Sequence, residues 1–217
     1  MHPSALNSVS PVLIHICIII SHSQIVIVGA GPSGLLLALL LSNLCPRPQI
    51  TLLDAASSLN TSPRATHYGP PAVSVLRRAG VLHTVRARGF LPRRLCWRKL
   101  DGTRIAGFDR GLLHGEDEDA LTVLSVGELS AICVEELQRR GVHVRWGEKV
   151  VAVGGTEKED SSAWVKTENA DGGAKYEADF VVGCDGGNSG VRKLVCGRDG
   201  FPGFTWGEQI VATNVGI

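Results

Sequence analysis

Aromatic residues, metal-binding spacings and long apolar runs are all scarce in this chain of 217 residues. Aromatic residues make up 5% and the net charge is +1. The chain therefore has neither the stacking platform nor the basic excess of a general nucleic-acid binder. None of its six cysteines forms a C-x-x-C pair, and no Cys/His cluster has the spacing of a zinc site. We expect no nucleic-acid partner and no metal.

The longest apolar stretch near the N-terminus is too short to cross a bilayer. It covers Val12–Ile20 and is interrupted by His15, whereas a spanning helix needs about 20 residues. No Lys or Arg precedes it and no small-x-small cleavage site follows it, so it is a poor signal peptide. We therefore expect no stable membrane insertion, a cytoplasmic location and free thiols.

Glycine, in contrast, is abundant: 26 of the 217 residues, or 12%, are glycine, compared with about 7% in an average protein. Three of these glycines form a G-x-G-x-x-G motif, Gly29-Ala30-Gly31-Pro32-Ser33-Gly34. The β-branched run Gln24–Val28 before it predicts a buried strand, and the apolar run Leu35–Leu44 after it predicts a helix. A second predicted strand, Gln49–Leu53, ends at Asp54.

This order of strand, glycine loop, helix, strand and acid is typical of a dinucleotide site. Gly29 permits a tight turn, Gly31 lets the backbone approach a pyrophosphate, and Gly34 lets the helix pack closely on the strand. The helix N-terminus offers free N–H groups to the phosphates. Asp54 would accept hydrogen bonds from the ribose. The candidate binding residues here are Gly29, Ala30, Gly31, Pro32, Ser33, Gly34 and Asp54.

A second candidate site follows the predicted strand Asp179–Cys184, at Asp185-Gly186-Gly187. A carboxylate there would meet the N-terminus of the predicted helix Ser189–Val195, which favours its ionised form. Asp185 could contact a ligand, or it could be an ordinary helix N-cap. Arg64, in a Pro-containing loop, could reach back over a pyrophosphate with a charge-assisted contact.

The rest of the chain predicts further strands and helices in an α/β arrangement. Asn60–Pro71 is typical of a loop, Ala72–Ala79 of a short helix ending at Gly80, and Asp101-Gly102 of a hairpin turn between Leu95–Leu100 and Thr103–Phe108. A capping box formed by Ser125 and Glu128 predicts the start of a helix that ends at Gly141. Further strands are predicted at Val142–Trp146, Lys149–Val153 and Trp164–Thr167, with a three-stranded antiparallel unit near residues 148–168.

Basic residues are concentrated between Arg77 and Arg110, where ten basic side chains accompany two acidic ones. A solvated surface is one interpretation, and attraction of a phosphate-bearing cofactor is the other.

Four features of the chain can be compared with known families: IVIVGAGPSGLLLALLL with Asp54, Arg64-Ala65, the helix Gly127–Arg140, and ADFVVGCDGGNSGVRKLV. Together they resemble the N-terminal part of the para-hydroxybenzoate hydroxylase family of flavoprotein monooxygenases. The resemblance covers residues 24–217. It implies an α/β fold, a Rossmann-like FAD-binding domain of the glutathione-reductase type with the start of a substrate-side β-sheet. It also implies FAD at Gly29, Gly31, Gly34, Asp54 and Arg64, with Asp185 and Gly186 beside the cofactor in a motif that also serves NAD(P)H. Such enzymes hydroxylate a phenol-like or other electron-rich aromatic small molecule.

The expected organisation follows the family, with three departures: the N-terminal extension, Val126 and a missing Gly-Asp motif. We expect an atypical extension at 1–23, FAD-binding parts at 24–89 and 125–197, substrate-side strands at 90–124, and the start of a truncated substrate domain at 198–217, with a strand at Trp206–Ile217. Val126 stands where the family usually has a Gln or Arg that reaches the flavin phosphates. The family's later Gly-Asp motif is absent, so we expect residues 1–217 alone to bind FAD weakly or not at all and to hydroxylate nothing.

Two other functions remain open from the sequence. One is a non-catalytic FAD- or nucleotide-binding fragment or pseudoenzyme. The other is an NAD-dependent Rossmann dehydrogenase, although Arg64 and the Asp185 motif fit FAD better.

Overall fold

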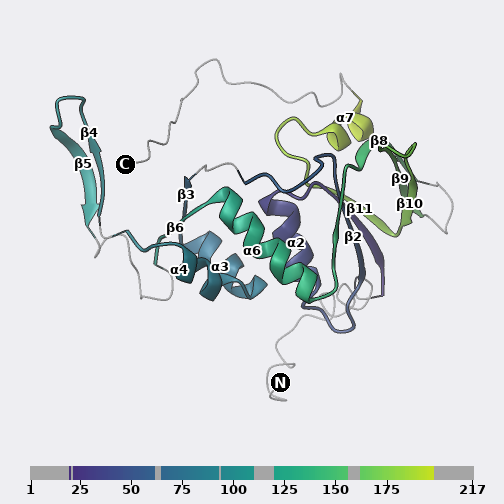
Figure 1. Cartoon of the computed structure of the whole chain (residues 1–217), viewed down its shortest axis with the longest axis horizontal. Coiled ribbons are helices and arrows are strands. Elements are labelled where there is room, and N and C mark those ends of the chain that lie inside the picture. The colour runs from purple at the N-terminus through teal and green to yellow at the C-terminus, as the bar shows by residue number, and fades with distance from the viewer. Residues whose placement is uncertain are drawn as a thin grey trace. The chain divides into compact units, whose positions relative to one another are not determined.

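A computed structural model of the chain describes residues 20, 22–61, 65–92, 94–109, 120–155 and 162–197 (Figure 1). The chain divides into two compact units. The first unit takes in 1–58 and 137–205, and the second takes in 59–136 and 206–217. The expected strand at Trp206–Ile217, Arg64 and most of the expected extension at 1–23 lie outside the described residues.

The first unit is built on a parallel sheet of four strands, which confirms the predicted α/β class. Its spatial order is β11 (Phe180–Gly183), β1 (Gln24–Val28), β2 (Gln49–Asp54) and β7 (Val144–Trp146), with each neighbouring pair parallel. The central strand places Ile27 between Leu52 and Val182. Ile27 and Leu52 are fully buried, as expected for β-branched and aliphatic strands covered on both faces.

Helix α2 (Pro32–Leu41) packs against this sheet and differs from its predicted bounds. It begins at Pro32 because proline is compatible with the first helical position. It ends at Leu41, with Ser42 as its C-cap, three residues before the predicted end at Leu44. At that end the Arg140 guanidinium donates to the Leu39 carbonyl at 3.1 Å, the Ser42 hydroxyl at 2.8 Å and the Asn43 side chain at 2.7 Å.

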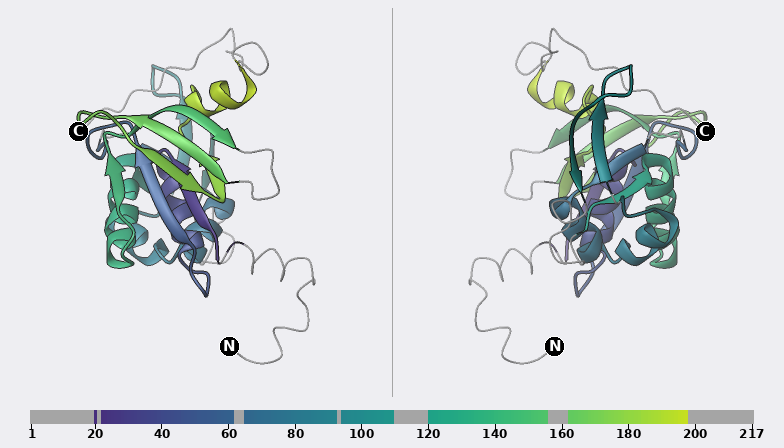
Figure 2. Two further views of the ribbon diagram at one scale, coloured as in Figure 1. Left: turned by 90° about the vertical axis from the view of Figure 1, so that its right-hand side faces the viewer. Right: turned by 90° about the vertical axis from the view of Figure 1, so that its left-hand side faces the viewer.

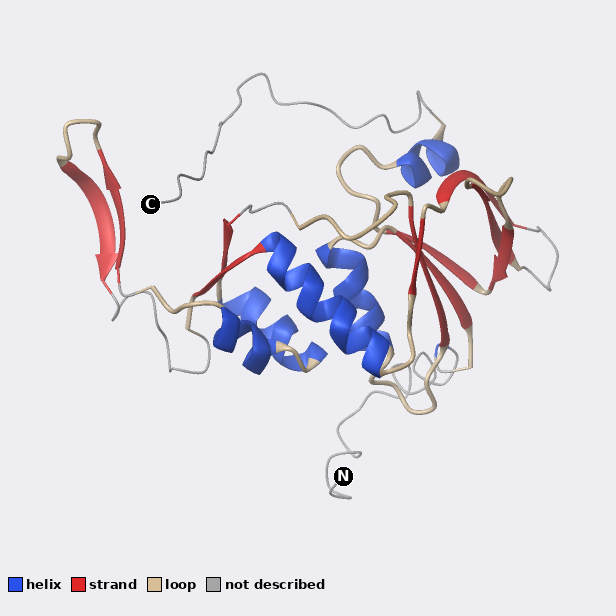
Figure 3. Ribbon diagram, viewed as in Figure 1, coloured by secondary structure: helices blue, strands red, loops and turns tan. Residues whose placement is uncertain are grey.

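An antiparallel sheet of three strands covers the other side of the parallel sheet, as Figures 2 and 3 show. Its order is β10 (Lys175–Ala178), β9 (Ala163–Glu168) and β8 (Lys149–Gly155). The predicted three-stranded unit is confirmed, although β10 lies beyond its predicted end. Side chains from both sheets and from α7 (Gly190–Cys196) form one core. Its buried members are Val26, Val28, Leu53, Val165, Ala178 and Val191.

The second unit combines helices with two small antiparallel sheets. One sheet pairs β3 (Ala65–Tyr68) with β6 (Thr122–Ser125), and the other pairs β4 (Arg94–Arg98) with β5 (Arg104–Asp109). The helices are α3 (Pro70–Ala79), α4 (Leu82–Arg88) and most of α6 (Val126–Arg139). The loop predicted over Asn60–Pro71 is therefore wrong, because it contains β3 and the start of α3. Helix α4 was not predicted.

The predicted hairpin is confirmed, but its connection is longer than Asp101-Gly102. Lys99 N donates to the Thr103 carbonyl at 2.8 Å, so three residues separate the last bonded pair. Gly102, with φ of 86°, supplies the left-handed position that such a loop needs.

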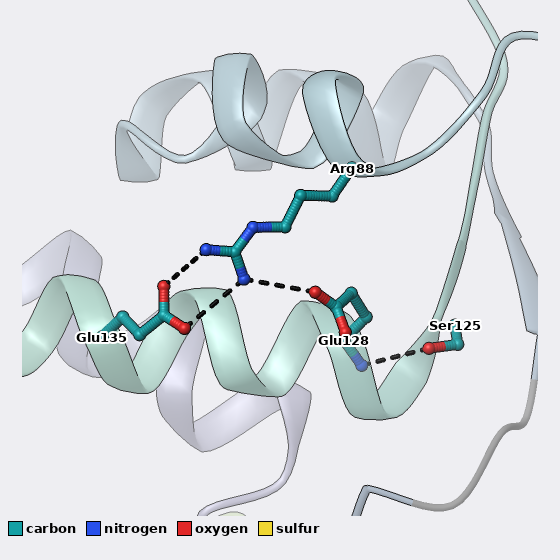
Figure 4. Close-up of polar contacts among 4 residues, drawn as sticks. All are labelled: Arg88, Ser125, Glu128 and Glu135. Carbon is teal, nitrogen blue, oxygen red and sulfur yellow. Dashed lines mark hydrogen bonds and ion pairs between the residues drawn. The ribbon is translucent and has the colours of Figure 1, made fainter.

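Only half of the predicted capping box forms at the start of α6. The Ser125 hydroxyl accepts from Glu128 N at 3.1 Å, which is the N-cap bond. The Glu128 carboxylate instead accepts from Arg88 on α4 at 3.2 Å, and Glu135 accepts from the same guanidinium at 2.8 Å (Figure 4). Arg88 thus links α4 to α6. It bonds to the Glu128 carboxylate that the second bond of the capping box would otherwise use.

Candidate functional site: the glycine loop cleft

The loop between β1 and α2 turns sharply at Gly29. Gly29 has φ of 105°, a left-handed value that favours glycine. Its N–H donates to the Leu53 carbonyl at 2.7 Å. A Cβ at this position would lie 2.4 Å from the Cys184 carbonyl oxygen. Both the turn and the neighbouring strand end therefore require glycine.

Gly34 is closely packed against neighbouring atoms, whereas Gly31 faces open space. A Cβ on Gly34 would lie 2.0 Å from the Gly29 carbonyl oxygen and 3.2 Å from the Cys184 Cβ, so α2 packs directly on the loop. A Cβ on Gly31 would meet no described atom within 4 Å. Gly31 is the N-cap of α2, and no side chain of the described residues caps that helix end. The N-terminus of α2 therefore faces open space with its backbone donors uncovered by those side chains.

Asp54 at the end of β2 braces the glycine loop. Its Oδ2 accepts from Ala30 N at 2.6 Å, and its Oδ1 accepts from Ala56 N at 2.8 Å. A carboxylate has about four lone-pair sites, so these two bonds leave capacity for hydroxyl donors of a ligand. Asp54 thus shapes the loop as well as facing the cleft.

Asp185 follows β11 and holds the start of α7 from outside the helix. Its Oδ1 accepts from the Ser189 hydroxyl and its Oδ2 from Val191 N at 3.0 Å. Ser189, rather than Asp185, is the N-cap, since its hydroxyl accepts from Arg192 N at 2.9 Å. Burial raises the pKa of Asp185, but the hydrogen bonds from Ser189 and the backbone outweigh it and leave the pKa below its usual value. The carboxylate is therefore ionised at neutral pH.

These residues surround one cleft of about 460 Å³ in the first unit. Five predicted site residues line it, namely Gly29, Gly31, Asp54, Asp185 and Gly186. Of the other predicted residues, Ala30 bonds to Asp54, while Pro32, Ser33 and Gly34 form the first turn of α2. Strands β1, β2 and β11 end together at this edge because they are neighbours in a parallel sheet.

Sequence reasoning missed the part of the wall that comes from the β7–β8 turn. Glu148 and Lys149 line the cleft beside Ala55. Glu148 N donates to the Asp54 carbonyl at 2.8 Å, which places this turn next to the end of β2. No pattern in the sequence indicates that β7 pairs with β2. For the two wall residues themselves, the one available signal was a charged Glu-Lys pair directly after Gly147 at the start of a strand.

Glu148 and Lys149 differ in what their charges do. The Glu148 carboxylate accepts from the Thr167 hydroxyl at 2.5 Å and from the Asn169 amide at 2.9 Å. The Thr167 bond contributes most to holding the Glu148 pKa below its usual value. Among the described residues that line the cleft, Lys149 is the only one with a basic side chain. Glu148 therefore fixes the turn, and Lys149 supplies positive charge at the rim.

Cys184 forms part of the floor and is not set up as a nucleophile. Burial, and then the neighbouring Asp185 charge, raise the pKa of its thiol. A thiol in such surroundings stays protonated and unreactive at neutral pH. In the described part of the chain, no group of three or more metal-ligating side chains comes together.

The cleft fits the adenosine diphosphate part of FAD. The fit depends on three observations: the uncapped N-terminus of α2, the open space over Gly31, and the Asp54 carboxylate with spare acceptor capacity. An N-terminus of this kind binds phosphate through backbone N–H groups and the helix dipole.

Comparisons with known proteins agree with this geometry. The family model described as "FAD binding domain" matches residues 22–213. Para-nitrophenol 4-monooxygenase from Pseudomonas sp. (strain WBC-3) is 31% identical over 88% of this chain and 46% of its own length. The 6-hydroxy-3-succinoylpyridine 3-monooxygenase HspB from Pseudomonas putida is 34% identical over 88% of this chain and 48% of its own length. The chain thus spans about half the length of the curated relatives it matches.

A solved structure of a monooxygenase is also similar to this chain. The crystal structure of p-nitrophenol 4-monooxygenase PnpA from Pseudomonas putida DLL-E4 superposes with a TM-score of 0.71 at 31% identity, over 80% of this chain and 43% of that one. No helix in the described part of the chain is both long and apolar enough to span a membrane. The FAD-binding family model covers most of the chain and the relatives are named as monooxygenases, so neither of the alternatives left open by the sequence is favoured. The chain belongs to the FAD-binding domain family, which its residues 22–213 match.

Proposed function

We propose that this chain is the FAD-binding part of an NAD(P)H-dependent monooxygenase that hydroxylates a phenol-like or other electron-rich aromatic small molecule. One observation carries the proposal: the open N-terminus of α2 lies in the same cleft as the Asp54 and Asp185 carboxylates. A cleft with phosphate donors at one position and hydroxyl acceptors at another suits a dinucleotide.

Each residue has a distinct part in holding the cofactor. The backbone N–H groups of Ser33 and Gly34 would donate to the pyrophosphate across the open space beside Gly31. Asp54 would accept from ribose hydroxyls while it keeps Ala30 in place. Arg64 would add a charge-assisted contact to the pyrophosphate, as the family resemblance implies.

Asp185 and Gly186 would lie beside the cofactor on the opposite wall. The bonds from Ser189 and Val191 fix the Asp185 carboxylate, so it can orient a neighbouring hydroxyl without moving itself. Gly186 has φ of 87°, and a Cβ added there would meet no described atom within 4 Å, so its backbone can approach a ligand closely.

The overall reaction consumes NAD(P)H, a proton, O₂ and an aromatic C–H bond, and yields NAD(P)⁺, water and an aromatic C–OH bond. FAD, when bound, would supply the redox chemistry between the nicotinamide, O₂ and the aromatic ring. The residues of this chain bind and orient, and they need no acid–base pair for that task. The relatives named for p-nitrophenol and 6-hydroxy-3-succinoylpyridine support an aromatic substrate, and we expect the enzyme to work in the cytoplasm.

A domain exchange tests this proposal. Residues 22–197 of this chain would replace the matching segment of p-nitrophenol 4-monooxygenase, with the unaltered enzyme as the positive control. We expect the hybrid to purify with bound FAD and to consume p-nitrophenol with NADH or NADPH. A matched hybrid carrying Gly31→Val should fold but lose both properties. A folded hybrid that binds no flavin would contradict the proposal.

A further inference from the structure

The strands of the parallel sheet reach the FAD cleft in a fixed spatial order, which is β11, β1, β2 and β7. The proposed pyrophosphate donors follow β1, and the proposed ribose acceptor Asp54 ends β2. The next position along this edge belongs to the turn after β7, whose Glu148 lines the cleft. A base extends from its ribose away from the pyrophosphate, so the adenine of FAD would lie against this turn.

Backbone bonds hold the β7–β8 turn to the ribose side of the cleft. Glu148 N donates to the Asp54 carbonyl at 2.8 Å, and Gly147 N donates to the Ala56 carbonyl at 2.7 Å. The position of Glu148 is therefore fixed relative to Asp54, the residue that would accept from the ribose hydroxyls.

The Glu148 carboxylate is itself held by side chains of the antiparallel sheet. It accepts from the Thr167 hydroxyl at 2.5 Å and from the Asn169 amide at 2.9 Å, and it also bonds to Tyr176. Thr167 is buried, and the Asn169 side chain in turn accepts from Gly173 N at 2.8 Å. A carboxylate fixed in this way needs little ordering when a ligand binds.

The same contacts make Glu148 an acceptor and not a donor. The Thr167 bond contributes most to holding the pKa of Glu148 below its usual value, and the nearby Arg145 charge acts in the same direction. An ionised carboxylate only accepts hydrogen bonds, and it has about four acceptor positions. Bonds from Thr167, Asn169 and Tyr176 leave one of them for a ligand N–H.

Lys149 leaves the turn on the other side. It lies opposite the exposed Glu168 in the register of β8 and β9, whereas Glu148 bonds to the buried Thr167. Successive side chains of a strand point to opposite faces of its sheet. The Lys149 ammonium therefore does not share the position of the Glu148 carboxylate.

We propose that Glu148 selects adenine as the base of the bound dinucleotide by accepting an N–H from its 6-amino group. This inference rests on the proposed function, because it takes FAD as the ligand. Hypoxanthine and guanine carry a carbonyl oxygen at position 6, which would place two acceptors against each other. The unmade bond and the repulsion both disfavour those bases.

Flavin fluorescence titration of the 217-residue chain tests this proposal with two ligands. One is FAD, and the other is flavin hypoxanthine dinucleotide, in which an oxygen replaces the 6-amino group. We expect the parent to prefer FAD by about tenfold or more, as one charge-assisted bond allows. Glu148→Gln replaces one acceptor oxygen with a donor and should bring the ratio of the two affinities close to one. A residue that only held the turn would change both affinities equally and leave that ratio unaltered.

Glu168→Gln is the matched control, because it removes the same charge from an exposed residue that does not line the cleft. Its affinity ratio should equal that of the parent, and an equal fall there would overturn the proposal. Circular dichroism would show that each variant is folded, and Glu148→Ala serves if Glu148→Gln is not.

The remaining outcomes separate this proposal from the proposed function. Saturable FAD binding with no preference over the hypoxanthine analogue, or a parental preference in Glu148→Gln, would overturn the selection by Glu148 alone. Absence of saturable binding of either dinucleotide by the parent would contradict the proposed function, and this proposal with it.

Discussion

Gly31 and Gly34 should respond to substitution in opposite ways, although both belong to one motif. In Gly34→Ala the new Cβ would lie 2.0 Å from the Gly29 carbonyl oxygen. Both atoms are attached to backbone, so the first turn of α2 must move away from the loop. Overpacking of this kind costs about 1–3 kcal/mol, against about 0.4–1 kcal/mol gained by replacing glycine within a helix. We expect a net loss of about 1–2 kcal/mol in the free energy of unfolding, or roughly 2–8 °C in the melting temperature.

Gly31→Val should leave the unliganded protein stable and remove FAD binding. Gly31 has φ of −73° and ψ of 176°, extended values that valine adopts readily, and its Cβ would enter open space. Loss of the N-cap preference costs at most about 1 kcal/mol. The isopropyl group would instead occupy the space beside the N–H donors of α2. Each charge-assisted bond lost should weaken FAD affinity by about 10- to 150-fold.

Two assays on the same three proteins check this pair of expectations. Thermal unfolding without FAD should rank the parent and Gly31→Val close together, with Gly34→Ala clearly lower. Flavin fluorescence titration should rank the parent above Gly31→Val. A Gly31→Val protein that binds FAD with parental affinity would refute the assignment of the cleft, and a Gly34→Ala protein as stable as the parent would refute the packing argument.

Three further predictions follow from the polar contacts. Lys149→Ala should weaken FAD binding and reduce its salt dependence, whereas Lys166→Ala, on β9 and away from the cleft lining, should change neither; fluorescence titration at two salt concentrations measures both. The pKa of Asp185 lies below its usual value, so its stabilising contribution is complete above the usual pKa and disappears as pH falls through the lowered one. Asp185→Asn should therefore lower stability at neutral pH and flatten the acid limb of the stability curve, and an unchanged limb in acid denaturation would show the reasoning to be wrong. Ser125→Ala should cost about 1 kcal/mol in chemical denaturation through loss of the α6 N-cap, and a cost near zero would mean that the bond to Glu128 N contributes little.

Local patterns in the sequence were sufficient to predict the elements around the glycine loop. The β-branched run at β1, the glycine spacing and the acid after β2 each act over a few residues, and the structure places Gly29, Gly31 and Asp54 on one cleft. The turn at Gly80 and the N-cap at Ser125 were predictable for the same reason.

Long-range pairing accounts for the features that were not predicted. β3 is a short strand in a Pro- and Gly-containing segment, and it is a strand because β6, distant in sequence, pairs with it from Thr122 to Ser125. Glu148 and Lys149 reach the cleft because β7 lies beside β2. The capping bond of Glu128 was lost to Arg88, a partner on another helix that no local pattern reveals.

The central claim is that FAD binds at the N-terminus of α2, and amide NMR of the 217-residue chain titrated with FAD tests it most directly. The sequence left weak binding and no binding open, and the cleft lined by Gly31, Asp54 and Asp185 favours weak but saturable binding. The largest shifts should occur at the amides of Gly31, Ser33 and Gly34, with smaller ones at Gly186. Largest shifts at residues outside the cleft, or none that saturate, would contradict the account.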